Sequence, residues 1–126
     1  MQLTLDTNNS QYIIRSYEPG KVLLADGTLI TNNFIISPDQ LINPWPVKTL
    51  QTLNTADLTQ IFDLNPEVVL LGSGEQLHFP DQAIITAFYN KHIGIEVMNT
   101  GAACRTYDVL MAEGRRVVAA LFLADW

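Results

Sequence analysis

The sequence has one cysteine, Cys104, and no long apolar run. A single cysteine cannot close an internal disulfide, so we expect a protein of a reducing compartment. The longest apolar stretch, residues 117–124, is far shorter than the roughly 20 residues that a membrane-spanning helix needs. Residues 1–6 contain neither the basic and apolar regions of a signal peptide nor an arginine-rich transit sequence. These absences predict a cytoplasmic protein without a membrane span.

Basic residues are also scarce. Seven lysines and arginines stand against 13 aspartates and glutamates, which gives a net charge of −6. An acidic surface repels the phosphates of nucleic acids and the anionic surface of a membrane. We therefore expect no nucleic-acid partner.

What the sequence does contain is a large apolar fraction. Hydrophobic residues make up 48% of the 126 residues, charged residues make up 16%, and the mean hydropathy is +0.13. This length is that of one domain, so we take residues 1–126 as a single α/β unit. The mean hydropathy is high for a soluble protein and leaves room for an exposed apolar patch that binds a protein partner.

The first half has the pattern of short strands joined by turns. Asp26 and Gly27 lie between two β-rich runs, and this pair is typical of a two-residue hairpin turn in which both positions take positive φ. Residues 38–55 follow with three prolines and little periodicity, which is typical either of a functional loop or of a segment that wraps the core. We expect strands at residues 12–17, 21–25, 28–31 and 34–37.

The second half alternates between helical and strand patterns. Its strands are apolar on both faces, and such strands need helices on both sides of the sheet. We therefore predict a mixed sheet covered by helices, with the N-terminal hairpin added at one edge or face. The predicted helices are residues 55–62, 81–92 and 100–113, and the predicted strands are residues 68–71, 93–98 and 116–123.

Two glycine-bearing loops follow two of these predicted strands. In open α/β sheets ligands bind beyond the carboxyl ends of the strands, where the amino end of a helix also offers free N–H groups to an anion. The alternative is that the glycines only permit tight turns and that Arg105 pairs with an internal acid. The candidate residues for a small anionic ligand are Gly72, Ser73, Gly74, Thr100, Gly101 and Arg105.

Glu96 alternates with Ile95 and Val97 in a strand whose pattern predicts burial. A buried carboxylate needs a partner, so we predict a structural ion pair of Glu96 with Arg105 or Arg116. The alternative is that Glu96 is a general acid or base with a shifted pKa.

No known catalytic or nucleotide-binding motif is present. Gly72-Ser73-Gly74 is followed neither by the third glycine of a dinucleotide fingerprint nor by the lysine of a P-loop, and Ser73 is not in a Gly-x-Ser-x-Gly elbow. His78 and His92 lack the spacing of metal ligands, and Cys104 lies beside alanines, which favours core packing over thiolate chemistry. We therefore predict no catalytic residue, no metal and no cofactor.

Two stretches of the chain resemble the signatures of one family. Residues 94–121 begin with Gly-Ile-Glu-Val-Met-Asn-Thr-Gly-Ala-Ala-Cys-Arg and resemble the longer signature. Residues 66–75, an apolar strand that ends in Gly-Ser-Gly, resemble the other. The family is an uncharacterised-domain family that includes the mitochondrial complex I assembly factor 3 and an adipogenesis-associated protein of the same domain. The resemblance is weaker before Pro66.

The resemblance implies a three-layer α/β fold whose central mixed sheet has its last strand antiparallel to its neighbours. The alternation of elements alone would favour a doubly wound sheet, and the tight turn at Gly114-Arg115 fits an antiparallel return. The family has no established reaction. The resemblance therefore implies a non-catalytic accessory protein, an assembly or interaction module for a larger complex such as respiratory complex I. The alternative is a small-anion-binding protein or an undiscovered enzyme at the glycine loops, and a homo-oligomer stays open.

Overall fold

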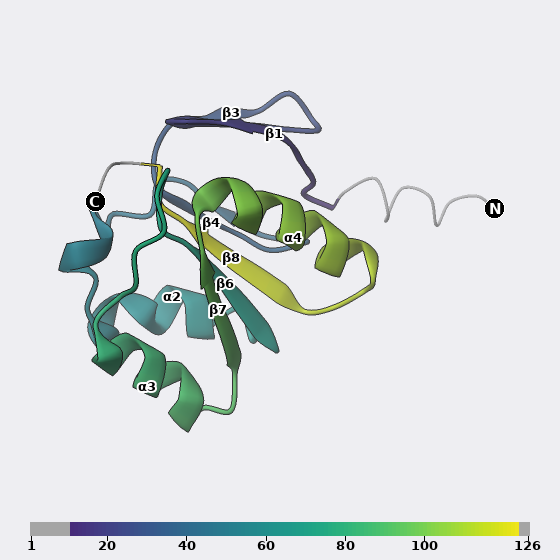
Figure 1. Cartoon of the computed structure of the whole chain (residues 1–126). Coiled ribbons are helices and arrows are strands. Elements are labelled where there is room, and N and C mark those ends of the chain that lie inside the picture. Colours follow the sequence, from purple (N-terminus) through teal and green to yellow (C-terminus); the bar gives the residue numbers. More distant parts are fainter. Residues whose placement is uncertain (1–10, 124–126) are drawn as a thin grey trace.

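The computed structural model describes residues 11–123, which form two β-sheets with helices packed on them (Figure 1). The smaller sheet is antiparallel and has the strand order β1-β2-β3. Its strands are β1 (Ile14–Glu18), β2 (Lys21–Leu24) and β3 (Leu29–Ile30). The predicted N-terminal hairpin is thus confirmed, and the strand predicted at residues 12–17 pairs with it.

The turn between β2 and β3 has three residues rather than the predicted two. Leu24 N donates to Thr28 O at 2.9 Å, which leaves residues 25–27 as the loop. Gly27 has a φ of 96°, whereas Asp26 does not have a positive φ. A loop that ends in a left-handed glycine is the common three-residue hairpin, and the carboxylate of Asp26 supports it by accepting from Thr28 N at 2.9 Å.

The larger sheet is mixed and has the strand order β5-β4-β8-β6-β7. β6 (Val68–Gly72) runs parallel to both of its neighbours, β7 (Gly94–Met98) and β8 (Val117–Leu121). β4 (Phe34–Ile36) runs antiparallel to β8 and to β5 (Leu41–Ile42). The last strand is therefore antiparallel to one neighbour only, which corrects the expectation that it runs antiparallel to both.

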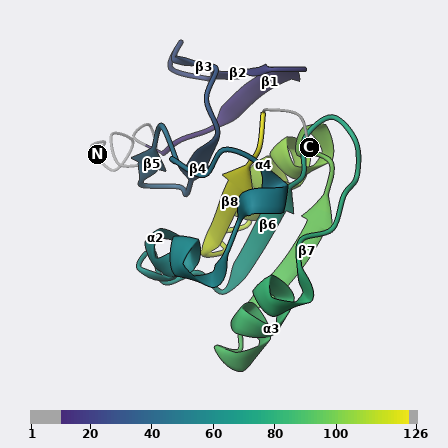
Figure 2. The same ribbon diagram turned by 90° about the vertical axis from the view of Figure 1, so that its left-hand side faces the viewer.

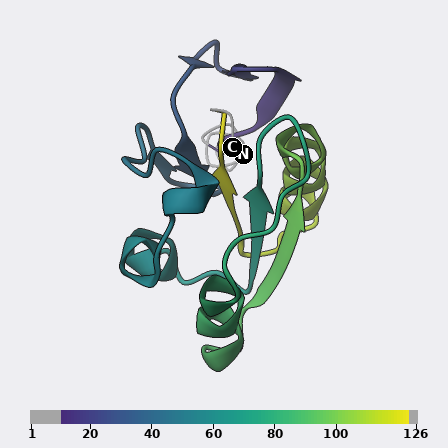
Figure 3. The ribbon, with the colours of Figure 1, turned by 60° about the vertical axis from the view of Figure 1, so that its left-hand side comes forward.

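Helices cover both faces of the larger sheet, which gives three layers (Figures 2 and 3). The crossovers β6-α3-β7 and β7-α4-β8 move in opposite directions along the sheet. Because parallel crossovers are right-handed, α3 and α4 lie on opposite faces. The turn after α4 joins a helix to a parallel strand, so its tightness does not require an antiparallel return. The helical segments are η1 (Leu50–Thr52), η2 (Thr55–Leu58), α2 (Thr59–Phe62), α3 (Gln82–Asn90) and α4 (Thr100–Ala112).

The central strand β8 separates two hydrophobic cores. Val117, Ala119 and Leu121 pack in the core that contains α4 and the smaller sheet. Val118 and Ala120 pack in the core that contains α2 and α3. A strand that is covered on both faces is apolar at every position, which explains why all five residues of β8 are buried.

Residues 38–55 wrap the core, so the second of the two interpretations of this segment is confirmed. Trp45 is buried, and its ring centroid lies 5.2 Å from that of Phe122. The side-chain amide of Asn33 donates to Val47 O at 2.8 Å and thereby holds the segment against the strand β4. Apolar burial and backbone hydrogen bonds therefore account for the segment without a ligand.

Candidate functional site

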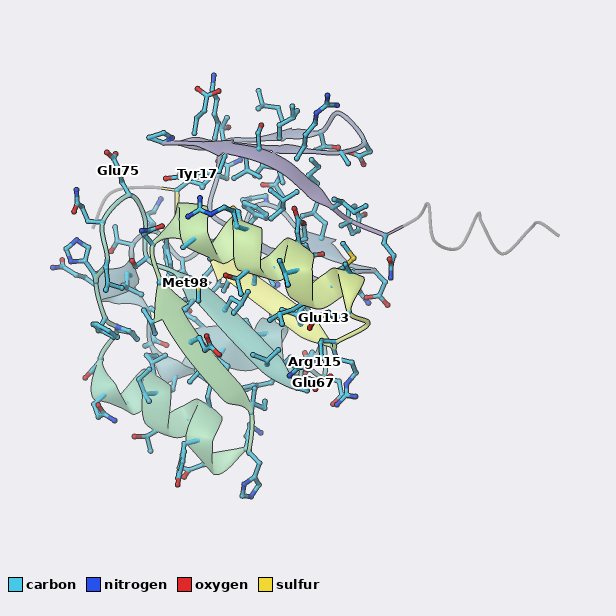
Figure 4. The ribbon with its side chains drawn as sticks, turned by 45° about the vertical axis from the view of Figure 1, so that its right-hand side comes forward. Tyr17, Glu67, Glu75, Met98, Glu113 and Arg115 are labelled. Atoms are coloured by element: carbon cyan, nitrogen blue, oxygen red, sulfur yellow. The ribbon has the colours of Figure 1, made fainter. Side chains whose placement is uncertain are left out.

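The two glycine loops meet at the carboxyl ends of β6 and β7, as predicted, but they close on each other. Ser73 N donates to Met98 O at 2.9 Å, and Thr100 N donates to Gly74 O at 2.8 Å. Gly74 N in turn donates to Thr100 Oγ1 at 2.8 Å. Figure 4 labels Met98 at this end of β7, next to the start of α4. These bonds continue the pairing of the two strands past their ends, and the protein's own backbone occupies this rim.

Thr100 is the central residue of the rim and is fully buried. Its hydroxyl accepts from Gly74 N and donates to Phe122 O at 2.7 Å, so it links the loops after β6 and β8 to the start of α4. Gly72 makes room for it, because a Cβ at position 72 would lie 2.9 Å from Thr100 Oγ1 and 2.8 Å from Leu121 Cδ2. Close packing therefore accounts for this glycine.

The amino end of α4 has most of its N–H groups bonded within the protein. Asn99, rather than the predicted Thr100, is the N-cap, and its side chain accepts from Ala102 N at 2.8 Å. Its backbone oxygen accepts from Ala103 N at 3.0 Å. With Thr100 N bonded at the rim, Gly101 N is left without a hydrogen-bond acceptor in residues 11–123. An anion at this helix end stays a prediction, and it would find one free donor rather than several.

Ser73 organises the loop that leads to α3. Its hydroxyl donates to Gln76 O at 2.7 Å and accepts from His78 N at 3.0 Å. The side chain is buried and is satisfied by these two bonds. Ser73 thus stabilises the loop conformation.

A groove of about 250 Å³ lies between β1 and α4. Gly101, Cys104, Arg105 and Asp108 line it from α4, and residues 14–17 line it from β1. Figure 4 shows Tyr17 of β1 above the amino end of α4. The ring of Tyr17 lies against Gly101, because a Cβ there would come within 3.1 Å of Tyr17 Cδ2. Arg105, which the sequence predicted for the rim, thus lines this groove.

Two hydrogen bonds fasten the segment around β1 to α4. Ile14 N donates to Asp108 Oδ1 at 3.0 Å, and the Tyr107 hydroxyl donates to Tyr12 O at 2.7 Å. Burial raises the pKa of Asp108, and the hydrogen bond from Ile14 N offsets part of that rise. Asp108 was not among the predicted site residues. Its position four residues after Cys104 was the available signal, because this spacing places a carboxylate on the buried face of the helix.

Cys104 is a core residue, and its side chain is 2% exposed. Burial, followed by the nearby carboxylate of Asp108, raises the pKa of the thiol to about 12, whereas Arg105 lowers it. The thiol is therefore protonated at neutral pH. The predicted packing role of Cys104 is confirmed.

The predicted ion pair of Glu96 is wrong. Glu96 is exposed, and it makes no salt bridge with Arg105, Arg116 or any other part of the chain that the structure describes. The reason is that β7 is an edge strand, and α4 packs mainly over β6 and β8. A strand at the edge of a sheet is therefore incompletely covered by that helix, and side chains on this face of the strand, such as Glu96, stay open to solvent even though the residues next to them in sequence are apolar.

Arg115 and Arg116 instead bind Glu67, at the opposite end of α4 from the groove. Arg115 Nε lies 3.1 Å from Glu67 Oε2, and Arg116 N donates to Glu67 Oε1 at 2.9 Å. Figure 4 labels Arg115 and Glu67 together at this end. The hydrogen bond from Arg116 N, followed by the one from Arg115, lowers the pKa of Glu67. This ion pair fastens the turn after α4 to the start of β6.

Within residues 11–123, no three histidine, cysteine, aspartate or glutamate side chains gather as a metal site would require. None of the helices in the same range is long and apolar enough to cross a membrane.

Residues 14–122 match a family model described as protein of unknown function (DUF498/DUF598). The chain belongs to this family. The match begins in β1 and ends one residue after β8, so the DUF498/DUF598 segment includes both sheets, the rim and the groove. The resemblance of residues 66–75 and 94–121 to one family is thereby confirmed.

Three similar proteins illustrate the relations of this DUF498/DUF598 chain. The NADH dehydrogenase [ubiquinone] 1 alpha subcomplex assembly factor 3 of Xenopus tropicalis is 28% identical over 106 residues, which cover 75% of this chain and 58% of that protein. The 13 kDa major membrane protein of Francisella tularensis is 26% identical over 118 residues, which cover 93% and 95%. An NMR structure of a Xanthomonas campestris protein is 36% identical, with a TM-score of 0.85 and coverage of 98% and 92%. The chain thus spans somewhat more than half of the assembly factor.

Proposed function

We propose that this chain is a non-catalytic accessory protein that acts by binding a protein partner. The observation that carries the proposal is the closed rim. α/β sheets hold their substrates beyond the carboxyl ends of parallel strands, and here that place is filled by hydrogen bonds between Ser73, Gly74, Met98 and Thr100. The rim therefore offers a weaker basis for catalysis than for a structural role.

The names of several relatives support the accessory role. Assembly factors of NADH dehydrogenase are 28% identical in the frog and 29% identical in the human protein. We extend the proposal to assembly of a larger complex, with respiratory complex I as its specific form. We also propose a cytoplasmic location, which the free, buried thiol of Cys104 supports because such thiols persist in reducing compartments.

Apolar side chains near α3 offer a surface for such a partner. Leu77 and Phe79, in the loop between β6 and α3, are 52% and 65% exposed, and Tyr89 on α3 is 79% exposed. α3 packs on β7, which is the edge strand of the larger sheet. Exposed aromatic side chains anchor protein interfaces, and an edge strand can pair with a strand of a partner.

The test is affinity purification of the tagged full chain from its own cells, with quantification of the proteins that copurify. Phe79→Asp and Tyr89→Asp should each deplete a specific protein that wild type enriches. Val109→Asp is the matched control, because Val109 is 56% exposed on α4, on the opposite face of the sheet. Equal recovery from all four proteins would contradict this surface, and the absence of any enriched protein would contradict the proposed function. Melting curves check that each variant is folded.

A further inference from the structure

The groove between β1 and α4 has the size of a small metabolite site. Its volume is about 250 Å³. This volume lies just below the range of about 300–1,000 Å³ that is typical of pockets for drug-sized ligands. A ligand that fills the groove is therefore smaller than a nucleotide and is comparable with an amino acid.

Arg105 brings a positive charge to the wall of the groove, where the residue is exposed to solvent. Within residues 11–123 its guanidinium makes no hydrogen bond and no salt bridge. Arg105 Nη1 lies 3.6 Å from the position that a Cβ of Gly101 would take, so the side chain extends back toward the amino end of α4. A guanidinium presents paired N–H groups that match the two oxygens of a carboxylate.

Asp108 brings an uncompensated negative charge to the groove. Its Oδ1 accepts from the neutral backbone N–H of Ile14, and its carboxylate has no salt-bridge partner among the residues described. Its other oxygen, Oδ2, accepts no hydrogen bond from residues 11–123, and no buried side-chain atom there lacks a partner, so Oδ2 is open to solvent. A half-buried carboxylate without a counter-charge is stabilised when a cationic group pairs with it.

The spacing of these two charges limits the ligand. Arg105 and Asp108 are three residues apart on α4, so their Cβ atoms are neighbours about 5–6 Å apart. The Arg105 side chain extends toward Gly101, and the two charged groups form no salt bridge with each other. A ligand that carries a carboxylate next to an ammonium, as an amino acid does, can therefore contact both charges from within the groove.

We propose that the groove between β1 and α4 binds a small zwitterion of amino-acid or dipeptide size, with its carboxylate on Arg105 and its ammonium on Asp108. Arg15 also lines the groove and adds a second positive charge at its β1 wall. The ring of Tyr17 and the side chain of Ile14 provide apolar surface for the carbon atoms of the ligand. The proposal is independent of the partner surface near α3.

The experiment measures binding of the 20 standard amino acids and glycylglycine to the full chain by calorimetry and by the shift in melting temperature. Propionate and propylamine serve as probes that carry one charge each. At least one zwitterion should bind wild type, and both single-charge probes should bind at least about tenfold more weakly. Arg105→Gln and Asp108→Asn should each lose about tenfold or more in affinity. Lys48→Gln removes one exposed charge that does not line the groove and should bind as wild type does.

A second measurement does not depend on the variants. In NMR spectra of the wild type, a bound zwitterion should shift the amide resonance of Ile14, whose N–H donates to Asp108, and that of Gly101. The amides of Ser73 and Gly74, which are bonded at the rim, should move little. The proposal is overturned if no zwitterion binds, if Arg105→Gln binds as wild type does, or if propionate binds as tightly and Asp108→Asn binds it more tightly. Shifts confined to the rim would also overturn it.

Discussion

The rim and the groove share Gly101 and differ in how their polar groups are bonded. At the rim, the N–H groups of Ser73, Gly74 and Thr100 all have protein acceptors at 2.9 Å or less. In the groove, Arg105 has no ion pair with any residue from 11 to 123, and Asp108 accepts from a single neutral donor. The rim is therefore closed by the protein's own hydrogen bonds, whereas the groove contains two charged groups that have no counter-charge among residues 11–123.

This difference separates two reasons for a residue to look functional. Glycines and helix amino ends are needed wherever a strand turns tightly into a helix, so they carry little information about a ligand. A partly buried charge without a counter-charge, such as the carboxylate of Asp108, lowers stability. Asp108 is thus a better guide to a site in this molecule than the glycines are.

The largest expected effect concerns the thiol at the groove. The pKa of Cys104 is raised from 9.0 to about 12, so at pH 8 the folded protein should contain about a thousandfold less thiolate than the unfolded chain. Labelling with a thiol reagent should be slow in buffer and fast in denaturant. Fast labelling of the folded protein would show that the groove exposes Cys104 to solvent, which would contradict its place in the core.

The rim should respond strongly to loss of the Thr100 hydroxyl. Thr100→Val removes the acceptor of Gly74 N and the donor to Phe122 O, and both partners are left unsatisfied in the interior. We expect the free energy of unfolding to fall by about 2–5 kcal/mol, measured by urea denaturation. Thr100→Ser keeps the hydroxyl and should lose much less. A larger loss in Thr100→Ser than in Thr100→Val would show that packing of the methyl group, which valine keeps, holds the rim together rather than the hydrogen bonds.

Gly72 should tolerate a methyl group poorly. Gly72→Ala places a Cβ 2.8 Å from Leu121 Cδ2 and 3.0 Å from Thr100 Cα, so we expect a loss of about 1–3 kcal/mol in urea denaturation. Gly94→Ala is the matched control on the neighbouring strand, because its nearest contact is 3.7 Å. That variant should be neutral or slightly more stable, since alanine restricts the unfolded chain. If Gly72→Ala left the free energy of unfolding unchanged, the rim would have enough free space for a methyl group, and a ligand could occupy the same space.

The smallest effect is the pH dependence that Asp108 contributes. The pKa of Asp108 is raised above 3.8 in the folded protein, so the folded state binds the proton of this carboxyl more tightly than the unfolded state does. The contribution of this proton to the free energy of unfolding is therefore complete below pH 3.8 and is lost as the pH rises through the folded-state pKa. Asp108→Asn, which cannot ionise, should therefore gain stability relative to wild type between pH 3.8 and neutrality. Solvent screens this half-exposed group, so the gain is small. Parallel stability–pH curves for the two proteins would show that ionisation of Asp108 does not destabilise the folded protein.

Much of the fold follows from local sequence patterns. The alternation after Pro66 predicted β6, α3, β7, α4 and β8, because apolar runs and helical spacing are local properties. The same patterns placed Leu58 and Ile61 on the buried face of a short helix. The strands that are apolar on both faces also predicted a mixed sheet with helices on both sides, and the family resemblance implied the same three-layer arrangement.

The error at Glu96 has a physical cause, which is that exposure depends on the order of strands in the sheet. Glu96 was predicted to be buried because its neighbours in sequence are apolar, but it is exposed because β7 lies at the edge of the sheet. The direction of β8 has a different origin: the alternation of elements favoured parallel strands, as β8 and β6 are, and the antiparallel expectation came from the family resemblance and holds only for the pairing with β4. Asp108 acquires its role only because β1, some 90 residues earlier, packs against its helix.

The central place of β8 also has a consequence for synthesis on the ribosome. β8 pairs with β4 on one side and with β6 on the other, so it joins the first half of the larger sheet to the second. A nascent chain that ends before residue 117 contains two separate pieces of sheet, each with an open edge. The larger sheet can therefore be completed only after almost the whole described chain has been made. Until then, the edges of β4 and β6 that will pair with β8 must not pair with other molecules.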